Sequence, residues 1–523
     1  MPDPPARTVD QLVRSRASGD GGKPMVIDPT RRISYRELDT TTADLAATFV
    51  EAGVGKGTRV GLIMPNSARW VQVAIALTRI GAVLVPLSTL LRAGELMAQL
   101  RAASVQFLVS VEEFRGHRYL DDLRSALALS DFGDGRLQNP ELPALRRVWT
   151  VDRLANPTAG ERARRIVDAM TETVTAADPL VIMFTSGSSG APKGVLHSHG
   201  GALGAVRSGL AARCITPDTR LYLPMPFFWV GGFGSGILST LLAGATLITE
   251  EMPRPETTLR LLESERVTLF RGWPDQAEAL ARHAAAAGAD LSALRPGSLE
   301  ALLPPDQRAR PGARATLFGM TEAFGPYCGY RADTDMPAAA WGSCGKPFEG
   351  MEIRIVDPDT GQRVSAGTAG MIQIRGPHTM RGICRRSRED LFTADGFYPS
   401  GDLGHLDEDG FLFYHGRSDD MFKVSGATVY PSEVERALRA IDGVDAAFVT
   451  NVPGAAGERV GAAVVRTGAL GVEHLRGSAR ELLSAFKVPT VWLLLESGDD
   501  VPRGATGKVE IHRLREMLIN ASS

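Results

Sequence analysis

The chain has 523 residues, a formal net charge of -2 at pH 7 and a hydrophobic content of 44%. This length allows two or more domains with a large core, and the near-neutral charge excludes the basic surface that nucleic acid binding needs. The N-terminus, Met1-Pro-Asp-Pro-Pro, lacks the apolar segment of a signal peptide, and no run approaches the roughly 18 apolar residues of a membrane span. We therefore expect a soluble, cytoplasmic protein with a small-molecule substrate, no nucleic acid partner and no membrane span.

The four cysteines are spread along the chain without a Cys-x-x-Cys pair: Cys214, Cys328, Cys344 and Cys384. This pattern favours buried, reduced thiols over a zinc site or a disulfide framework. Lysine is rare, with seven residues among 58 basic ones. A position that remains lysine is then enriched for sites that need a compact ammonium group.

Residues 34–110 alternate helical and extended patterns, which predicts βαβ units and a parallel sheet covered by helices. The predicted helices are 35–52, 68–79 and 94–102, and the predicted strands are 59–64, 82–86 and 105–109. Residues 131–178, with glycine, proline and mixed charge, are interpreted as a surface connection. The apolar run 180–183 predicts a short buried strand.

The doubly wound pattern continues to about residue 350. Helices are expected at 197–212, 231–242, 255–265 and 276–287, and strands at 220–226, 245–249 and 267–271. Short strands at 352–356, 371–375 and 410–414 then indicate a β-rich subdomain, about 345–418. Beyond it, helices at 432–440 and 479–486 and strands at 446–451 and 462–466 indicate a separate α+β unit. The predicted fold class is α/β, with a large N-terminal domain at 1–418 and a small domain at 419–523.

A glycine- and hydroxyl-rich segment, Phe184-Thr-Ser-Gly-Ser-Ser-Gly-Ala-Pro-Lys-Gly194, follows the strand at 180–183. Glycine lets the backbone approach an anion, hydroxyl groups add donors, and Lys193 supplies a point charge. The segment is not a Walker loop, because Pro192 precedes the lysine and Gly194 follows it. A flexible connector is the plainer interpretation, but the proline, the lysine and the preceding strand favour a polyphosphate site.

Four further motifs follow in order. Phe318-Gly-Met-Thr-Glu322 places a hydroxyl beside a carboxylate that can hold magnesium. Tyr398-Pro-Ser-Gly-Asp402 places an acid after a tight turn, where a carboxylate can bind both ribose hydroxyls. Gly416-Arg-Ser-Asp-Asp-Met-Phe-Lys-Val-Ser-Gly426 and Pro502-Arg-Gly-Ala-Thr-Gly-Lys508 complete the set. Each is a weak signal alone, and their common order is hard to assign to chance.

With these motifs, the chain resembles the adenylate-forming superfamily, which contains acyl-CoA and aryl-CoA synthetases, peptide synthetase adenylation domains and firefly-type luciferases. The resemblance extends from about Tyr35 to Leu518. It implies a large N-terminal domain joined by a hinge to a mobile C-terminal domain. It also implies ATP, Mg²⁺ and coenzyme A as cofactors and substrates.

The family's site residues carry over position by position. The resemblance assigns the pyrophosphate portion of ATP to the loop residues Thr185, Ser186, Gly187, Ser188, Ser189, Gly190 and Lys193. It places Thr321 at the α-phosphate, Glu322 at the magnesium ion and Phe318 beside adenine. Asp402 would bind the ribose hydroxyls, and Arg417 would contact ribose or phosphate.

The resemblance also implies a moving part. Asp419 would be the hinge, and Lys508 the mobile catalytic lysine that reaches the carboxylate and the α-phosphate. Ser425 and Gly426 would line the channel for the coenzyme A thiol after the small domain rotates. Lys508 and magnesium would neutralise the charge that grows as a carboxylate attacks phosphorus.

Two segments depart from the family pattern. In Pro226-Phe-Phe-Trp-Val-Gly-Gly232, Trp229 stands where histidine is common. We interpret Phe228, Trp229, Gly231 and Gly232 as the edge of an acyl pocket that suits an apolar or aryl acid, with core packing as the alternative for the phenylalanines. In 296–305, Leu299 and Glu300 replace the family's small residues, so no adenine-binding residue is assigned from this segment.

The predicted function is the activation of an organic acid as its acyl-adenylate, followed by transfer to the thiol of coenzyme A. An alternative is a ligase that passes the activated group to a carrier-protein thiol or an amine, or that activates a non-carboxylate oxyanion. Another is a non-catalytic nucleotide-binding protein, against which the retained Lys508 argues. The sequence leaves open the acid, a carrier-protein partner and a homodimer.

Overall fold

The computed structural model describes residues 6–133, 135–154, 159–185, 192–418, 422–424, 427–454, 457–483, 485–504 and 509–521. The chain divides into two compact units. Unit 1 is Met1–Glu352 with Arg375–Gly396, and unit 2 is Ile353–Ile374 with Phe397–Ser523. The α/β fold class is confirmed, and a boundary at 418/419 stays a prediction.

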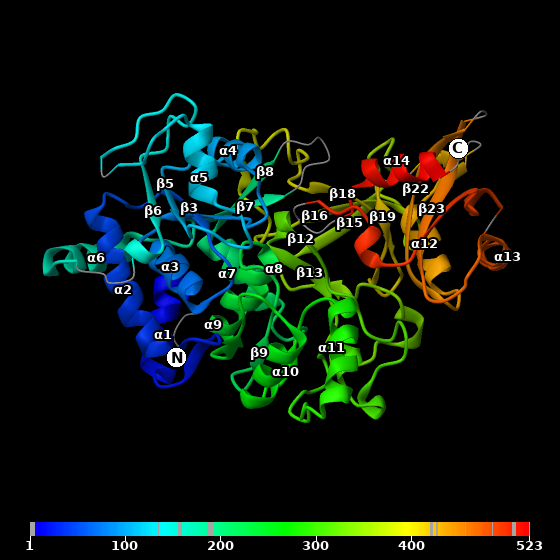
Figure 1. Ribbon diagram of the computed structural model, residues 1–523, viewed down its shortest axis with the longest axis horizontal. Helices are drawn as coiled ribbons and strands as arrows, with labels where there is room; N and C mark the ends of the chain where they lie inside the picture. Colours follow the sequence, from blue (N-terminus) through cyan, green and yellow to red (C-terminus); the bar gives the residue numbers. More distant parts are fainter. Residues whose placement is uncertain are drawn as a thin grey trace. The chain divides into compact units, whose positions relative to one another are not determined.

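A seven-stranded sheet forms the first layer of unit 1, in the order β17-β8-β7-β4-β3-β5-β6 (Figure 1). Its strands are β3 (Arg59–Ile63), β4 (Val83–Leu87), β5 (Phe107–Ser110), β6 (Arg147–Thr150), β7 (Pro179–Thr185), β8 (Lys193–Ser198) and β17 (Gly382–Ile383). The strands from β7 through β4, β3 and β5 to β6 run parallel, and β8 is antiparallel to β7 and to β17. Strand β8 is therefore paired on both edges.

Side chains alternate between the two faces of this sheet, as the two-residue period of a strand requires. Leu62 and Val181 lie in a large core on one face, whereas Ile63 and Ile182 lie in a second core on the other. The first face is covered by α1 (Val9–Asp20), α2 (Tyr35–Glu51), α3 (Ala68–Arg79) and α6 (Glu161–Thr173), and the second by α4 (Ala93–Ala102) and α5 (Tyr119–Ala126). Both faces are buried, which explains the nearly continuous apolar strands.

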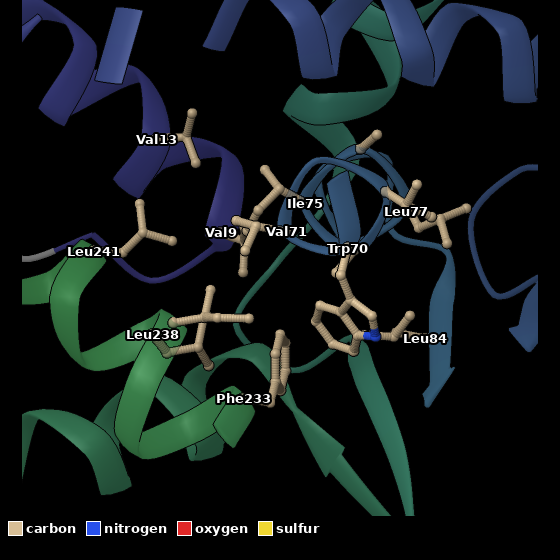
Figure 2. Close-up of a cluster of buried hydrophobic side chains, with 14 of the residues drawn as sticks. Val9, Val13, Trp70, Val71, Ile75, Leu77, Leu84, Phe233, Leu238 and Leu241 are labelled. Carbon is tan, nitrogen blue, oxygen red and sulfur yellow. The ribbon is translucent and has the colours of Figure 1, made fainter. Parts of the chain in front are cut away.

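A five-stranded sheet, in the order β11-β9-β10-β1-β2, shares the large core. Its strands are β1 (Pro24–Ile27), β2 (Arg32–Ser34), β9 (Arg220–Tyr222), β10 (Thr246–Ile248) and β11 (Leu269–Phe270). Its outer face packs against α10 (Pro255–Ser264) and α11 (Pro274–Ala287). Between the sheets, Figure 2 shows the indole of Trp70 beside Phe233, with their ring centroids 5.9 Å apart. The apolar side chains of α7 (His199–Ser208) and α9 (Ser239–Ala243) complete this core.

Unit 2 contains a four-stranded sheet and a further α+β group. The sheet has the order β15-β16-β18-β19, formed by β15 (Glu352–Val356), β16 (Gly370–Arg375), β18 (Tyr398–Leu406) and β19 (Leu412–Arg417). Strands β20 (Phe422–Val424) and β21 (Ala427–Val429) pair with each other, and β22 (Val444–Gly454), β23 (Gly457–Arg466) and β24 (Val491–Leu495) form another sheet. The helices are α12 (Pro431–Arg439), α13 (Val472–Leu482) and α14 (Ile511–Ala521).

Most predicted elements are confirmed, and the helix predicted at 68–79 has the bounds of α3. The interpretation of 131–178 as a surface connection is wrong. Strand β6 is the edge of the seven-stranded sheet, and Val167 of α6 lies in the large core. Charged residues on the outer face of α6 masked an apolar stripe at helical spacing. Helices α1, α5 and α14 were not predicted.

The structure also bears on the predictions of buried, reduced cysteines and of no membrane span. Cys328 and Cys344 are buried and free, as expected, whereas Cys214 and Cys384 are free but only half-buried. None of the helices in the described part of the chain is long and apolar enough to span a bilayer.

Arg79 joins three helices inside unit 1. Its side chain is 1% exposed, and Nη2 lies 2.7 Å from Asp10 Oδ1 on α1 and 2.8 Å from Asp39 Oδ1 on α2. Nη1 also donates to Thr42 Oγ1 on α2 at 2.8 Å. A buried ion pair of this kind is costly to break, because removing one partner leaves a charge without compensation.

We expect Arg79→Met to lower the free energy of unfolding of unit 1 by about 3 to 5 kcal/mol, because the Asp10 carboxylate loses its buried partner. Urea unfolding followed by tryptophan fluorescence measures this. Arg101→Met is the matched control, since the Arg101–Glu141 pair is exposed and should cost at most about 1 kcal/mol. Equal losses of unfolding free energy in both variants would contradict the stabilising role of the buried Arg79 ion pairs.

His199, at the start of α7, is a buried base. Its Nδ1 accepts a hydrogen bond from the Val9 amide at 3.3 Å, which ties α1 to α7. The pKa of His199 is lowered to about 4, mainly by burial; nearby Asp178 opposes this shift, and Lys56 adds to it. The folded protein therefore keeps a neutral ring where an unfolded histidine takes up a proton below pH ~6.5.

Because the unfolded state binds more protons below pH ~6.5, we expect the stability of unit 1 to fall as the pH drops from about 6.5 towards 4. His199 contributes at most about 3 kcal/mol to this loss. His199→Gln should flatten the pH dependence of the urea midpoint over that range. His283→Gln, at an exposed histidine on α11, should leave it unchanged. A wild-type slope in His199→Gln would refute this linkage.

Candidate functional site

The predicted phosphate loop connects two antiparallel strands. Thr185 ends β7 and Lys193 begins β8, and these two residues are direct partners in the register of the pair. Directly opposite residues in an antiparallel pair hold their side chains close together. Thr185 and Lys193 therefore share one face at the ends of the two strands that the loop connects.

The predicted acidic motif forms the turn of a β-hairpin in unit 1. Strands β12 (Phe318–Met320) and β13 (Gly325–Gly329) pair antiparallel, and Thr321–Ala323 form a 3₁₀ turn between them (Figure 1). Phe324 closes the turn with a φ of +56°, a left-handed conformation that a bulky residue rarely adopts. Its amide donates to the Thr321 carbonyl at 3.0 Å. The carboxylate-bearing Glu322 is 9% exposed.

Strand β8 holds this turn through a buried histidine. His197 Nε2 lies 2.7 Å from the Thr321 carbonyl oxygen, and the imidazole meets Phe324 edge to face at 4.9 Å. Burial lowers the pKa of His197 to about 4, and the bond to Thr321 opposes this shift. The phosphate-loop strand and the acidic turn are thus joined directly.

A second pair of predicted residues meets in unit 2. Asp402 on β18 and Arg417 on β19 are register partners, and Arg417 Nη1 lies 3.3 Å from Asp402 Oδ1 and donates to the Ser400 carbonyl at 2.8 Å. A side chain on Gly401, where φ is +75°, would come within 2.8 Å of the Arg417 guanidinium. The expectation that Asp402 follows a tight turn is wrong, because Gly401 and Asp402 both lie within β18.

The aromatic segment at 226–232 is anchored by Asn66. Its Oδ1 accepts the Phe227 amide at 2.8 Å, and its Nδ2 donates to the Met225 carbonyl at 2.9 Å. Phe227 is fully buried and Phe228 is 6% exposed. The half-buried Trp229 meets Phe228 edge to face at 5.6 Å.

Trp229 has a second aromatic partner in Trp273, which precedes α11, at 6.1 Å and an interplanar angle of 87°. Neighbouring atoms leave no room for a side chain at Gly231 or Gly232. A Cβ on Gly232 would lie 2.1 Å from the Pro226 carbonyl oxygen, and one on Gly231 would lie 2.9 Å from Met225 Sδ. At Gly232 the missing side chain serves close backbone packing.

The departing segment at 296–305 packs beside β11. The Leu299 amide donates to the Phe270 carbonyl at 3.2 Å, and Leu302 and Leu303 are buried in the outer core. Glu300 Oε2 accepts the Ala309 amide at 2.8 Å. Leu299 and Glu300 therefore have local packing and hydrogen-bonding roles.

Several predicted site residues lie outside the described residues. They are Ser186, Gly187, Ser188, Ser189 and Gly190 of the loop, the hinge residue Asp419, the channel residues Ser425 and Gly426, and Lys508. Their assigned roles stay predictions, as do those of Thr185, Lys193, Phe318, Thr321, Glu322, Asp402 and Arg417.

The residues in place fit a nucleotide with a divalent cation. Unit 1 supplies hydroxyl, ammonium and carboxylate groups around β8, from Thr185, Lys193, Thr321 and Glu322. Carboxylate oxygen is the ligand that Mg²⁺ prefers, and the ammonium suits a phosphate. In the acidic turn, the Thr321 and Glu322 carbonyls accept bonds from His197 and from the Met380 amide, so the turn is fixed through its backbone.

Sequence reasoning missed His197, Asn66 and Trp273. His197 was expected to begin a helix at 197–212, but it lies within β8, and α7 begins only at His199. The signal for Asn66 was a polar residue directly before the cap of α3. Trp273 had no signal of its own, because its contact with Trp229 joins segments 44 residues apart in sequence.

Comparison with known proteins identifies the family of the chain. Residues 13–384 match the family described as AMP-binding enzyme. The chain is 33% identical, over 97% of its length and 98% of the relative, to the Mycobacterium tuberculosis protein named 3-[(3aS,4S,7aS)-7a-methyl-1,5-dioxo-octahydro-1H-inden-4-yl]propanoyl:CoA ligase. It is 31% identical, over 91% of its length and 92% of the relative, to a feruloyl-CoA synthase of Amycolatopsis.

Solved structures share the fold. An anthranilate CoA ligase in complex with anthranoyl-AMP matches with a TM-score of 0.79 and 21% identity, over 98% of both chains. The Bacillus subtilis o-succinylbenzoate coenzyme A synthetase, in complex with ATP and magnesium, matches with a TM-score of 0.77 and 23% identity, over 97% of this chain and 98% of the other. At these identities the structures support the fold alone.

Proposed function

The chain belongs to the AMP-binding enzyme family, and from that premise we propose that it is an AMP-forming acid–coenzyme A ligase whose substrate is an apolar, ring-containing acid. The observation that carries the reaction class is the attachment of two predicted phosphate-binding groups to one strand. Lys193 begins β8, and His197 on the same strand holds the turn that bears Thr321 and Glu322.

Each half-reaction then has its own residues. Thr185 and Lys193 would hold the pyrophosphate portion of ATP, and Thr321 would bind the α-phosphate while the acid attacks phosphorus. A magnesium ion at Glu322 would supply charge neutralisation when bound. Asp402 would bind the ribose hydroxyls, Arg417 would contact ribose or phosphate, and Lys508 would complete the charge balance in the transition state.

Transfer to coenzyme A requires the catalytic lysine to leave. Asp419 would be the hinge for this movement, and Ser425 and Gly426 would line the path of the thiol. Attack of the thiolate sulfur on the acyl carbon forms the thioester and releases AMP.

The choice of acid rests on the aromatic segment. The rings of Phe228, Trp229 and Trp273 are in contact, and Asn66 accepts a hydrogen bond from the backbone of the same segment. Apolar rings favour burial against such walls. The relatives' names, which include feruloyl and an indene-derived propanoyl group, support a ring-containing acid.

The reaction class is tested by AMP release. Purified protein with ATP, Mg²⁺ and a panel of aryl, alicyclic and linear acids should release AMP, and thioester should appear only when coenzyme A is added. Pyrophosphate without thioester would favour a carrier-protein or amine acceptor. ATP binding without pyrophosphate from any acid would favour a nucleotide-binding protein without ligase activity.

We expect Lys508→Ala to lower ATP–pyrophosphate exchange by at least about 100-fold, because the lysine stabilises charge that develops only in the transition state. Binding of Mg²⁺·ATP, followed by thermal shift, should change little. Lys346→Ala, at an exposed lysine on β14 (Lys346–Pro347), is the matched control and should keep wild-type exchange. Wild-type exchange in Lys508→Ala would remove the catalytic assignment.

We expect Trp229→Ala to lower kcat/KM for ring-containing acids by about 10- to 100-fold, because a buried aromatic contact contributes about 1.5 to 3 kcal/mol. Short linear acids should be affected less. Trp341→Ala is the control, since this half-buried tryptophan packs against Arg310 instead. An equal loss for both classes of acid would exclude Trp229 as a selector.

A further inference from the structure

His197 lies at the junction of three segments of unit 1 that are far apart in the sequence. Its ring is 1% exposed and contacts the Thr321 carbonyl through Nε2 and the Phe324 ring edge to face. Lys193, Val195 and His197 alternate along β8 and so share one face of the strand. The strand that begins with the predicted phosphate lysine therefore presents, on the same face, a side chain that reaches the acidic turn.

Three hydrogen bonds close a ring around this junction. His197 Nε2 bonds to the Thr321 carbonyl at 2.7 Å, and the Met380 amide donates to the Glu322 carbonyl at 2.7 Å. The Arg381 amide then donates back to the Leu196 carbonyl, on the residue before His197, at 2.8 Å. Two of these bonds are between main-chain groups. The His197 bond is the one that a side chain supplies, and thus the one that a substitution can remove.

The ring nitrogen that donates is determined by the acceptor. A carbonyl oxygen cannot donate, so Nε2 carries the proton, and a neutral imidazole then has a bare Nδ1. This Nδ1 is buried and has no hydrogen-bond partner among the described residues. A buried polar atom without a partner destabilises the fold. Leucine would fill the same apolar surroundings without this cost, so packing alone does not account for the histidine.

The turn that His197 holds is itself strained. Phe324 has a φ of +56°, and both its amide and the His197 ring bond to the same Thr321 oxygen. A bulky residue in this region costs about 1 kcal/mol or more and persists when its surroundings enforce it. The ring of Phe324 is enclosed by His197, by Phe233 at 6.3 Å and by Gly234, where a Cβ would lie 3.1 Å away.

We propose that His197 is a positioning residue of the ligase: its Nε2–H holds the Thr321 carbonyl and thereby fixes the side chains of Thr321 and Glu322 relative to the strand that bears Lys193. The proposal rests on the proposed function, since it concerns how the α-phosphate and magnesium residues are placed. In this role His197 need not touch nucleotide or acid. It acts on the first half-reaction through the backbone of the turn.

The experiment compares His197→Leu, His197→Gln and His199→Leu with the wild type. Leucine keeps the apolar bulk and removes the donor, whereas glutamine places an amide N–H near the position of Nε2. His199→Leu is the matched control, because His199 is an equally buried histidine two residues along the chain that bonds to Val9 instead. It should lower stability without disturbing the turn.

We expect kcat/KM for Mg²⁺·ATP in ATP–pyrophosphate exchange to fall about ten-fold in His197→Leu, the effect of losing roughly one buried hydrogen bond. The Mg²⁺ concentration at half-maximal exchange should rise in the same variant. His197→Gln should recover most of both losses. His199→Leu should match the wild type in both measurements at a temperature where all variants are folded.

Hydrogen exchange by mass spectrometry provides a readout that does not need activity. In His197→Leu, amides in a peptide covering 318–330 should exchange about ten-fold faster than in the wild type, because the turn loses an anchor. His197→Gln should protect this peptide, and His199→Leu should speed exchange near Val9 but not in 318–330. Wild-type protection of 318–330 in His197→Leu would overturn the positioning role.

The two measurements separate the two proposals. A wild-type protein that shows no ATP–pyrophosphate exchange with any acid would refute the ligase function. It would also refute this role for His197, whatever the hydrogen exchange of 318–330 shows. An active wild type with an equally active His197→Leu would overturn the positioning role alone. A loss of activity that His197→Gln fails to rescue and His199→Leu reproduces would assign His197 to stability only.

Discussion

The burial of one apolar core between two mixed β-sheets is the constraint on which unit 1 depends. Strands of the seven-stranded and five-stranded sheets both contribute to this core, together with the helices between them. Burying apolar surface on both sides of each sheet is the dominant stabilising term for such a layered fold. Trp70 lies at its centre, in edge-to-face contact with Phe227 at 5.4 Å and Phe233 at 5.9 Å. The aromatic segment that carries Trp229 begins from this core.

Strand β8 connects the sheet of unit 1 to the predicted site residues. It is paired with β7 on one edge and with β17 on the other, so its position is fixed by main-chain bonds on both sides. Elements fixed in this way hold functional groups more accurately than loops do. Lys193 at its start and His197 near its end connect it to the phosphate loop and to the acidic turn.

In unit 2, the pairing of strands β18 and β19 holds two predicted site residues. Asp402 and Arg417 are direct partners on β18 and β19, and Gly401 provides the room that the guanidinium occupies. The helix α12 packs against β19, where Ser432 Oγ donates to the His415 carbonyl. These two predicted nucleotide-binding residues are therefore held by main-chain pairing, as are Thr185 and Lys193 in unit 1.

The sequence by itself determined the α/β class, most element positions and the residue types of the site, because periodicity and local motifs are properties of neighbouring residues. Helix 68–79 and the strand at 352–356 needed no tertiary information. Only the tertiary structure decided the role of 131–178, the contact of Trp229 with Trp273 and the bond from His197 to Thr321, which joins residues 124 positions apart. Such contacts depend on how elements pack, and a single sequence contains no local pattern that marks them.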